Sequence, residues 1–286
     1  MPIKNILFPV DFSPSSIGMA AFVKRAAALA GAKVTLLHVF DPASYSGLEL
    51  YVRTPIEIAE EHEKIAHDQL HKFLRAEFPL SESPRILVTG DPAAQIVKTA
   101  RKGFDLIMMP THAGTFRRML LGSTTAKVLN DADCPVVTSM HTETIAPRPL
   151  EHREWLCAIG LSNDSRRVLG YAHEVSSALG SHLRIIHAIQ AVDPHVPVRL
   201  DLEEHIQSEE RKQALQRIDE LQRKVGTHVP VRVAVGLVKD ALIEVARQSD
   251  ADALIIGRSP QSGALGRLRD LTYAIVRDSP FPVVSV

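Results

Sequence analysis

The sequence predicts two consecutive α/β domains, each with a doubly wound, parallel sheet of five strands. Four segments recur in the same order, at a nearly constant offset of about 147 residues. They are LLHVF at 36–40 and IIHAI at 185–189, IVKTAR at 96–101 and LIEVAR at 242–247, DLIMMP at 105–110 and DALIIG at 252–257, and DADCPVV at 131–137 and DSPFPVV at 278–284. This offset is far longer than a solenoid repeat, so each copy is expected to be a domain. We assign the domains to residues 1–143 and 153–286, joined by a linker at 144–152.

Within each copy, short apolar runs alternate with helical patterns, which indicates βαβ crossovers and a parallel sheet. The runs are continuously apolar, as expected for strands that helices cover on both faces. In the first copy the expected strands are 6–10, 33–40, 85–89, 105–109 and 135–139. In the second copy they lie near 154–160, 182–188, 229–235, 252–256 and 282–286.

The helices of the first copy carry recognisable start and stop signals. Ser13 is the expected N-cap of the first helix and Gly31 its expected stop. The second helix opens with a proline in its first turn, and Asp91 is expected to cap the third. The expected helices are 14–30, 55–77, 92–102 and 123–131.

Composition excludes several classes of function. The 286 residues include 33 Lys and Arg and 33 Asp and Glu, so the formal net charge is zero. Coating a nucleic acid or an anionic membrane requires a basic excess, so we expect neither partner. Two cysteines cannot form a disulfide framework, and their spacing gives no metal pattern. Without a signal peptide or a long apolar run, a cytoplasmic location is expected.

Two loops at the expected carboxyl ends of strands are the first candidates for a ligand site. Ligands of open α/β sheets bind beyond these strand ends, where the winding reverses. The loops are PVDFS at 9–13 and the stretch 110–124, which ends in Gly122, Ser123 and Thr124. A helix N-terminus has free N–H groups and a partial positive charge, so it suits phosphate. The alternative interpretation is that Gly122 and Ser123 only form a turn and an N-cap.

These segments, together with VTGDPAAQIVKTA and the run 105–137, resemble the universal stress protein (UspA) family over nearly the whole chain. The resemblance implies an adenine-nucleotide-binding fold of the adenine nucleotide alpha hydrolase-like type, with strand order 3-2-1-4-5 in each domain. Nucleotide-binding members carry Asp after the first strand and G-x2-G-x9-G-(S/T) after the fourth. The resemblance therefore implies ATP or a related adenine nucleotide as the ligand and leaves open whether Mg²⁺ accompanies it.

Transferred position by position, the resemblance gives a partial match in the first domain. Asp11 stands at the family's Asp, and Gly122 and Ser123 at its terminal Gly-Ser. Pro110 replaces the first glycine of the motif, and the span from Pro110 to Gly122 is one residue shorter than the motif requires. The residues expected to bind the nucleotide are Pro9, Val10, Asp11, Val39, Met109, Thr111, His112, Gly122, Ser123 and Thr124.

The second domain departs further from the motif. Gly160 takes the place of the Asp, and the Gly-Ser position is Arg269-Asp270. Gly257 keeps the first glycine, but Pro260 replaces the second. We therefore expect a degenerate site that does not bind ATP.

Other polar residues are interpreted as structural. His38 and His187 occupy equivalent places in apolar strands and are expected to be satisfied structural histidines. Glu63, His67 and His71 lie on one helical stripe, but no third strong ligand follows, so a solvated face is favoured over zinc. We expect no catalytic residue and no metal site.

The resemblance also implies partners within and between chains. The two domains are expected to pair through their last strands, as the subunits of a single-domain dimer do, which covers two exposed sheet edges. Apart from the resemblance, covering these edges leaves the long helices or the loops 41–54 and 190–200 available, so a homodimer is left open.

These observations lead to three hypotheses about function. The leading hypothesis is a non-catalytic stress-response protein that senses an adenine nucleotide in its first domain. The second is a stress protein that binds no nucleotide and acts through protein association alone. The third is a slow ATPase, which the sequence favours least because it has no P-loop motif.

Overall fold

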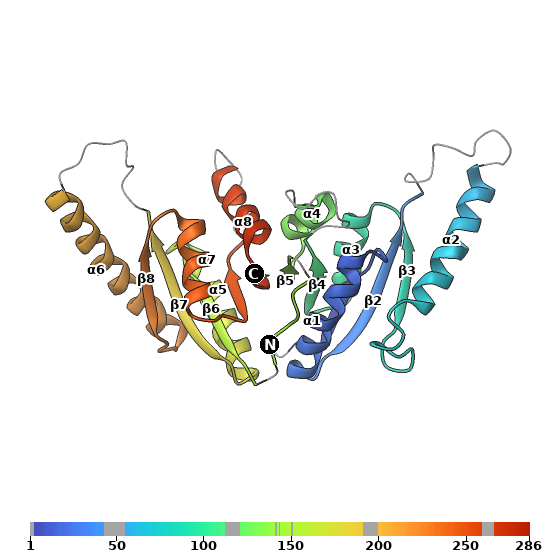
Figure 1. Ribbon diagram of the computed structural model, residues 1–286, viewed down its shortest axis with the longest axis horizontal. Coiled ribbons are helices and arrows are strands. Elements are labelled where there is room, and N and C mark those ends of the chain that lie inside the picture. Colours follow the sequence, from blue (N-terminus) through green and yellow to red (C-terminus); the bar gives the residue numbers. More distant parts are fainter. Residues whose placement is uncertain are drawn as a thin grey trace. The chain divides into compact units, whose positions relative to one another are not determined.

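The computed structural model describes residues 3–42, 55–111, 121–140, 142, 144–149, 151–190, 200–258 and 266–286. The chain divides into two compact units, Ile3–Pro147 and Arg148–Val286. This division falls inside the segment expected to be the linker. Each unit is a parallel sheet with helices on both faces (Figure 1).

The sheet of the N-terminal unit has the strand order β3-β2-β1-β4-β5, and all its pairs are parallel. Its central strand pairs with both neighbours, since Ile6 is in register with Val34 on one side and with Leu106 on the other. The fold class and the order 3-2-1-4-5 are thereby confirmed. The strands are β1 (Asn5–Pro9), β2 (Lys33–Phe40), β3 (Arg85–Thr89), β4 (Leu106–Pro110) and β5 (Val136–Ser139).

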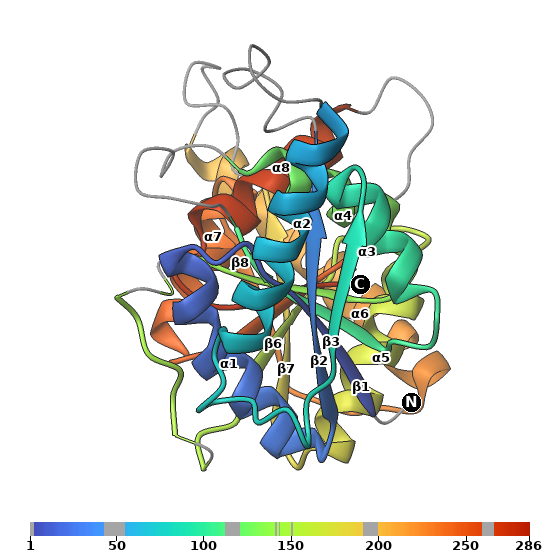
Figure 2. The ribbon, with the colours of Figure 1, turned by 90° about the vertical axis from the view of Figure 1, so that its right-hand side faces the viewer.

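The helices lie on two faces of this sheet, because the chain winds first to one side of β1 and then to the other, and crossovers between parallel strands keep one hand. Helices α1 (Pro14–Ala30) and α2 (Pro55–Lys72) pack on β2, and α2 lies in front of β2 and β3 in Figure 2. Helices α3 (Pro92–Ala100) and α4 (Ser123–Asp131) pack against each other.

The predicted caps of α1 and α3 are confirmed. The Ser13 hydroxyl accepts a hydrogen bond from the Ser16 N–H, and Gly31 ends α1 in the left-handed conformation with φ of 63°. The Asp91 carboxylate accepts a hydrogen bond of 2.9 Å from the Ala94 N–H at the start of α3. These caps fix the directions in which both helices leave the carboxyl edge of the sheet.

Helix α2 is shorter than the sequence predicts, because it ends at Lys72 rather than at residue 77. Leu74 has a φ of 50°, a left-handed conformation that cannot continue the helix. The chain then turns so that Phe78 is 3% exposed and packs edge-on against Phe8 of β1, with ring centroids 6.0 Å apart. Burial of this aromatic ring outweighs the local helical pattern.

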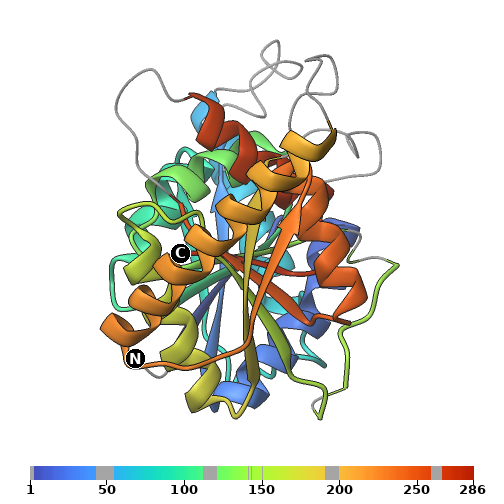
Figure 3. The same ribbon diagram turned by 90° about the vertical axis from the view of Figure 1, so that its left-hand side faces the viewer.

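The C-terminal unit repeats the fold with the order β8-β7-β6-β9-β10 (Figure 3). Its sheet is also parallel throughout. The strands are β6 (Glu154–Ala158), β7 (His182–Ile189), β8 (Val231–Val235), β9 (Ala253–Ile256) and β10 (Val283–Ser285). The helices are α5 (Ser165–Ala178), α6 (Leu200–Val225), α7 (Val238–Gln248) and α8 (Gly266–Asp278).

Within the described residues, no helix combines the length and the apolar character that crossing a membrane would require. The loops proposed for a homodimer, 41–54 and 190–200, lie almost entirely outside the described residues. The homodimer therefore stays a prediction. The pairing of the last strands stays a prediction as well.

Candidate functional site

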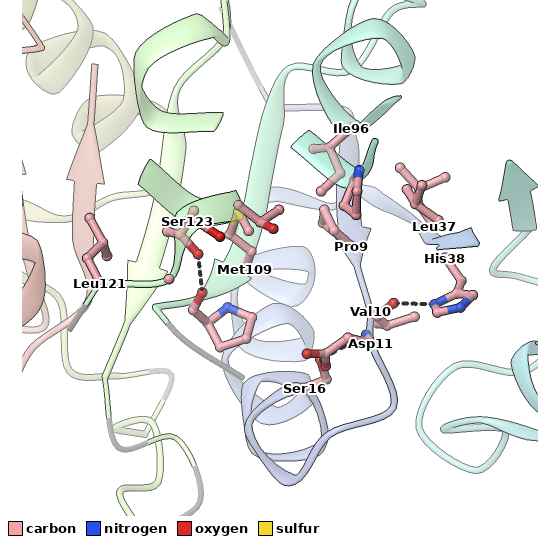
Figure 4. A pocket seen from close by; sticks show the side chains of 16 residues that line it. Pro9, Val10, Asp11, Ser16, Leu37, His38, Ile96, Met109, Leu121 and Ser123 are labelled. Atoms are coloured by element: carbon pink, nitrogen blue, oxygen red, sulfur yellow. Dashed lines mark hydrogen bonds between the residues drawn. The ribbon is translucent and has the colours of Figure 1, made fainter. Parts of the chain in front are cut away.

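A cavity of about 400 Å³ lies in the N-terminal unit, at the carboxyl ends of β1 and β4 where the winding reverses. It combines apolar walls with polar groups, among them the carboxylate of Asp11 and the first turn of α4 (Figure 4). The lining residues are Pro9, Val10, Asp11, Ser16, Leu37, His38, Val39, Pro92, Ile96, Met109, Pro110, Leu121, Gly122, Ser123, Thr124 and Thr125.

One carboxylate oxygen of Asp11 is held at the start of α1. Its Oδ1 accepts hydrogen bonds from the hydroxyls of Ser13, at 2.5 Å, and Ser16, at 2.6 Å, and from the Ser13 N–H, at 3.1 Å. The carboxylate thereby lies beside the N-terminus of α1, where the helix has its partial positive charge. Among the described residues, none donates a hydrogen bond to Oδ2. The Asp11 carboxylate is therefore held in position through one oxygen, and the other oxygen is available to a ligand.

Free backbone donors lie at the first turn of α4. Gly122 is the N-cap, and no side chain caps this helix. The Gly122 N–H is used, because it donates to the Thr111 carbonyl at 3.0 Å, and the first bond within the helix runs from the Ala126 N–H to the Gly122 carbonyl. Within the described part of the chain, the N–H groups of Ser123 and Thr124 have no acceptor. This turn is consequently suited to bind an anion.

Behind the apolar wall, the end of β1 is joined to β2. The Val10 N–H donates to the Leu37 carbonyl at 2.8 Å, and the His38 Nδ1–H donates to the Val10 carbonyl at 2.8 Å (Figure 4). Burial lowers the pKa of His38, against weaker opposing effects of this hydrogen bond and of Asp11, so the ring is neutral at pH 7. His38 is thus a satisfied structural histidine, as predicted, that also lines the cavity.

Phe12 extends this wall toward α2. It has a φ of 62°, which is rare for an aromatic residue, and its ring centroid lies 4.2 Å from that of His38. Its other neighbour is Phe73, with centroids 5.2 Å apart in an edge-on arrangement. These ring contacts offset the strain at Phe12 and hold Asp11, the preceding residue, in place.

The structure brings together most of the residues expected to bind a nucleotide. Thr111 lies elsewhere, because it is 1% exposed and its N–H donates to the Ser139 carbonyl of β5, so it does not line the cavity. His112 is outside the described residues. The eight that line the cavity are Pro9, Val10, Asp11, Val39, Met109, Gly122, Ser123 and Thr124.

Sequence reasoning missed several lining residues from other elements. Ser16 could have been found, since it lies one helical turn after the N-cap and its hydroxyl can reach back to Asp11. Pro92 and Ile96 gave no signal, because they reach the cavity only through the packing of α3.

The sequence profile described as the Universal stress protein family matches residues 2–139 and again residues 152–286. The chain belongs to the universal stress protein family. It is 25% identical to a universal stress protein of Mycolicibacterium smegmatis over 296 aligned residues. The alignment covers 99% of this chain and 96% of that protein.

Other relatives match over about half of the chain or over nearly all of it. A universal stress protein of Methanocaldococcus jannaschii is 30% identical over 150 residues, covering 47% of this chain and 93% of that protein. A crystal structure of a universal stress protein from Archaeoglobus fulgidus matches with a TM-score of 0.65 and 21% identity, covering 99% of this chain and 95% of that one. This last likeness supports the fold alone.

In the second universal stress domain, the helix that corresponds to α4 begins at an earlier position of the repeat. Relative to Ser123, the equivalent position in the repeat is residue 270, yet α8 already begins at Gly266. The free N–H groups of a helix belong to its first turn, so position 270 lies beyond them. The side chains of Arg269 and Asp270, and Pro260 as a whole, lie outside the described residues.

Proposed function

We propose that the N-terminal universal stress domain binds ATP or a related adenine nucleotide and acts as a non-catalytic sensor. The observation that carries this proposal is the placement of Asp11 and the first turn of α4 on one cavity of about 400 Å³. A cavity with apolar walls and a few convergent polar groups is typical of a small-molecule site.

Each part of a nucleotide has a chemically matched counterpart. The apolar side chains of Val10, Val39 and Met109 provide a surface for the flat base. Oδ2 of Asp11 can accept hydrogen bonds from the ribose hydroxyls. The N–H groups of Ser123 and Thr124, with the partial positive charge of α4, can bind phosphate oxygens. This arrangement supports a nucleotide bound across the carboxyl edge of the sheet, and Mg²⁺ beside its phosphates stays a prediction.

The decisive experiment is a calorimetric titration of ATP into the wild type and Asp11→Asn, after mass spectrometry of any nucleotide that the purified protein releases. The asparagine oxygen can still accept hydrogen bonds from Ser13 and Ser16, so the start of α1 should persist. Loss of the charged acceptor should weaken binding at least about tenfold.

The matched control is Asp133→Asn, because Asp133 is an exposed carboxylate that pairs with Arg101 away from the cavity. It should leave the affinity for ATP unchanged. Equal affinity in the wild type and Asp11→Asn would refute the proposed role of Asp11, and no measurable ATP binding by the wild type would refute nucleotide sensing.

One observation favours the alternative of a protein that acts through association alone. Pro110 stands where the family motif has its first glycine, and proline has no N–H to offer a phosphate. On this alternative, ATP leaves the melting temperature unchanged, whereas a ligand that binds only the native state at 100 times its Kd adds about 2.7 kcal/mol of stability. Measured release of inorganic phosphate would instead favour the third candidate, a slow ATPase.

A further inference from the structure

The C-terminal domain contains its own cavity, of about 340 Å³, at the equivalent edge of its sheet. The main chain around it repeats that of the first site. The Ile159 N–H donates to the Ile186 carbonyl at 2.9 Å, and the His187 Nδ1–H donates to the Ile159 carbonyl at 2.7 Å. The corresponding bonds around Val10 are each 2.8 Å. The strand end is therefore conserved in geometry between the two halves of the chain, although its side chains differ.

One hydroxyl at this cavity lacks a partner. Ser165 opens α5, lines the cavity and is 5% exposed, and its Oγ is buried without a hydrogen bond among the described residues. Its counterpart in the repeat is Ser16, whose hydroxyl donates to Asp11. A buried hydroxyl without a partner is costly, so this position favours a ligand that brings its own acceptor.

The acceptor is missing because Gly160 stands where Asp11 stands in the first domain. Gly160 lines the cavity, and a Cβ added to it would meet no atom within 4 Å. Open space thus replaces the side chain that satisfies Ser16 in the first half. A ligand atom can occupy this space and accept the hydrogen bond from Ser165.

The lining indicates an uncharged and largely apolar ligand. Asp164, which pairs with Arg167 at 4.0 Å, is the acidic residue at the cavity, and the described lining includes no Lys or Arg, so an anion would find no basic side chain in that lining. Because α8 begins at Gly266, position 270 lies beyond the free N–H groups of its first turn, so the equivalent of Ser123 has no free N–H for a phosphate. The larger apolar side chains that line the cavity include Ile159, Val168, Leu242, Ile256, Leu271 and Ile275.

We propose that this cavity binds a small, neutral, mainly apolar molecule that carries a carbonyl group. The carbonyl oxygen accepts the hydrogen bond of Ser165 in the space left by Gly160, and the apolar body lies against the side chains of β9, α7 and α8. The two universal stress domains consequently bind different classes of ligand, a charged nucleotide in the first and a neutral carbonyl compound in the second.

The test uses Prodan, a neutral fluorescent ketone whose emission shifts to the blue in apolar surroundings, titrated into the full chain. The substitution Gly160→Asp supplies the missing carboxylate and fills the space, so it should raise the Kd of Prodan at least about tenfold. Ser165→Ala removes the donor and should raise the Kd about threefold to tenfold. The control is Gly170→Ala on α5, where an added Cβ meets no atom within 4 Å, and it should bind as the wild type does.

The outcomes separate the alternatives. Equal Kd values for Prodan in the wild type, Gly160→Asp and Ser165→Ala refute the proposal. Release of two nucleotides per chain also refutes it, because the second cavity would then hold a nucleotide. Tighter binding of the anionic naphthalene sulfonate ANS than of Prodan, lost in Gly160→Asp, would overturn the neutral class. All variants lie in the C-terminal domain, so failure of ATP binding by the first domain leaves this test intact, and Ser165→Ala carries it if Gly160→Asp fails to fold.

Discussion

Substitution of Arg85 by methionine tests how the wall behind the N-terminal cavity is held. The Arg85 guanidinium, on β3, donates to the carbonyls of Ser83 at 2.5 Å, Phe78 at 2.6 Å and Phe73 at 3.3 Å. These carbonyls belong to the turn that follows α2, where burial of Phe78 ends the helix early. Phe73 in turn packs on Phe12, so the guanidinium connects β3 to the aromatic residues beside Asp11.

The expected loss follows from the two short hydrogen bonds. A hydrogen bond to a charged group contributes about 1.5–3 kcal/mol, so the pair could contribute about 3–6 kcal/mol. Two effects offset part of this contribution. Burial lowers the pKa of Arg85, so keeping the guanidinium charged at this place has a cost. The carbonyls released by the substitution also regain some hydration. We expect Arg85→Met to lower the free energy of unfolding by about 2–4 kcal/mol, or the melting temperature by on the order of 10 °C.

The assay is thermal unfolding followed by circular dichroism, with Arg101→Met as the control. Arg101 also pairs with a carboxylate, Asp133, but both side chains are mostly exposed, so its loss should leave the melting temperature unchanged. The reasoning fails if both variants melt at the same temperature. A second readout is the affinity for ATP, which should fall in Arg85→Met if the aromatic residues position Asp11.

Three further predictions concern titratable groups. Burial lowers the pKa of His38, so the unfolded chain binds this proton more readily and the free energy of unfolding should fall as the pH drops from 7 to 5. In urea titrations, His38→Gln should flatten this dependence on pH. An unchanged slope in His38→Gln would contradict the role of His38. The Arg277 guanidinium lowers the pKa of Asp278 to about 2 from 3.8, so about 1 kcal/mol of stability, after solvent screening, should be present above pH 4 and be lost as the pH falls toward 2. Asp278→Asn should remove this acid-dependent part, and a wild-type acid profile would contradict the assignment. Burial raises the pKa of Cys157 to about 12, so a thiol reagent at pH 8 should label Cys134 far faster, and fast labelling that survives Cys134→Ser would disprove this.

Local patterns in the sequence were sufficient for most of the fold. The caps at Ser13 and Asp91 and the stop at Gly31 act through neighbouring residues, so their effect can be predicted without tertiary contacts. The early end of α2 could not be predicted, because the periodic pattern continues to residue 77. It results from the contact of Phe78 with Phe8, on a strand 70 residues earlier in the chain.

The candidate site was predictable only in part, for the same reason. Asp11 and Ser123 could be selected because each stands at a strand end or helix start, where the main chain itself prepares a site. The contribution of Ile96 depends on how α3 packs, and Thr111 turns toward β5 although Pro110, which precedes it, lines the cavity.

By itself, the sequence determined the duplication, the α/β class and the loss of an aspartate in the second half, because these depend on the order and type of residues. Only the tertiary structure decided what that loss means. It placed Ser16 against Asp11 in one domain and left Ser165 buried without an acceptor beside open space at Gly160 in the other. The physical reason is that the need of a buried hydroxyl for a partner depends on which groups the fold brings within hydrogen-bond distance.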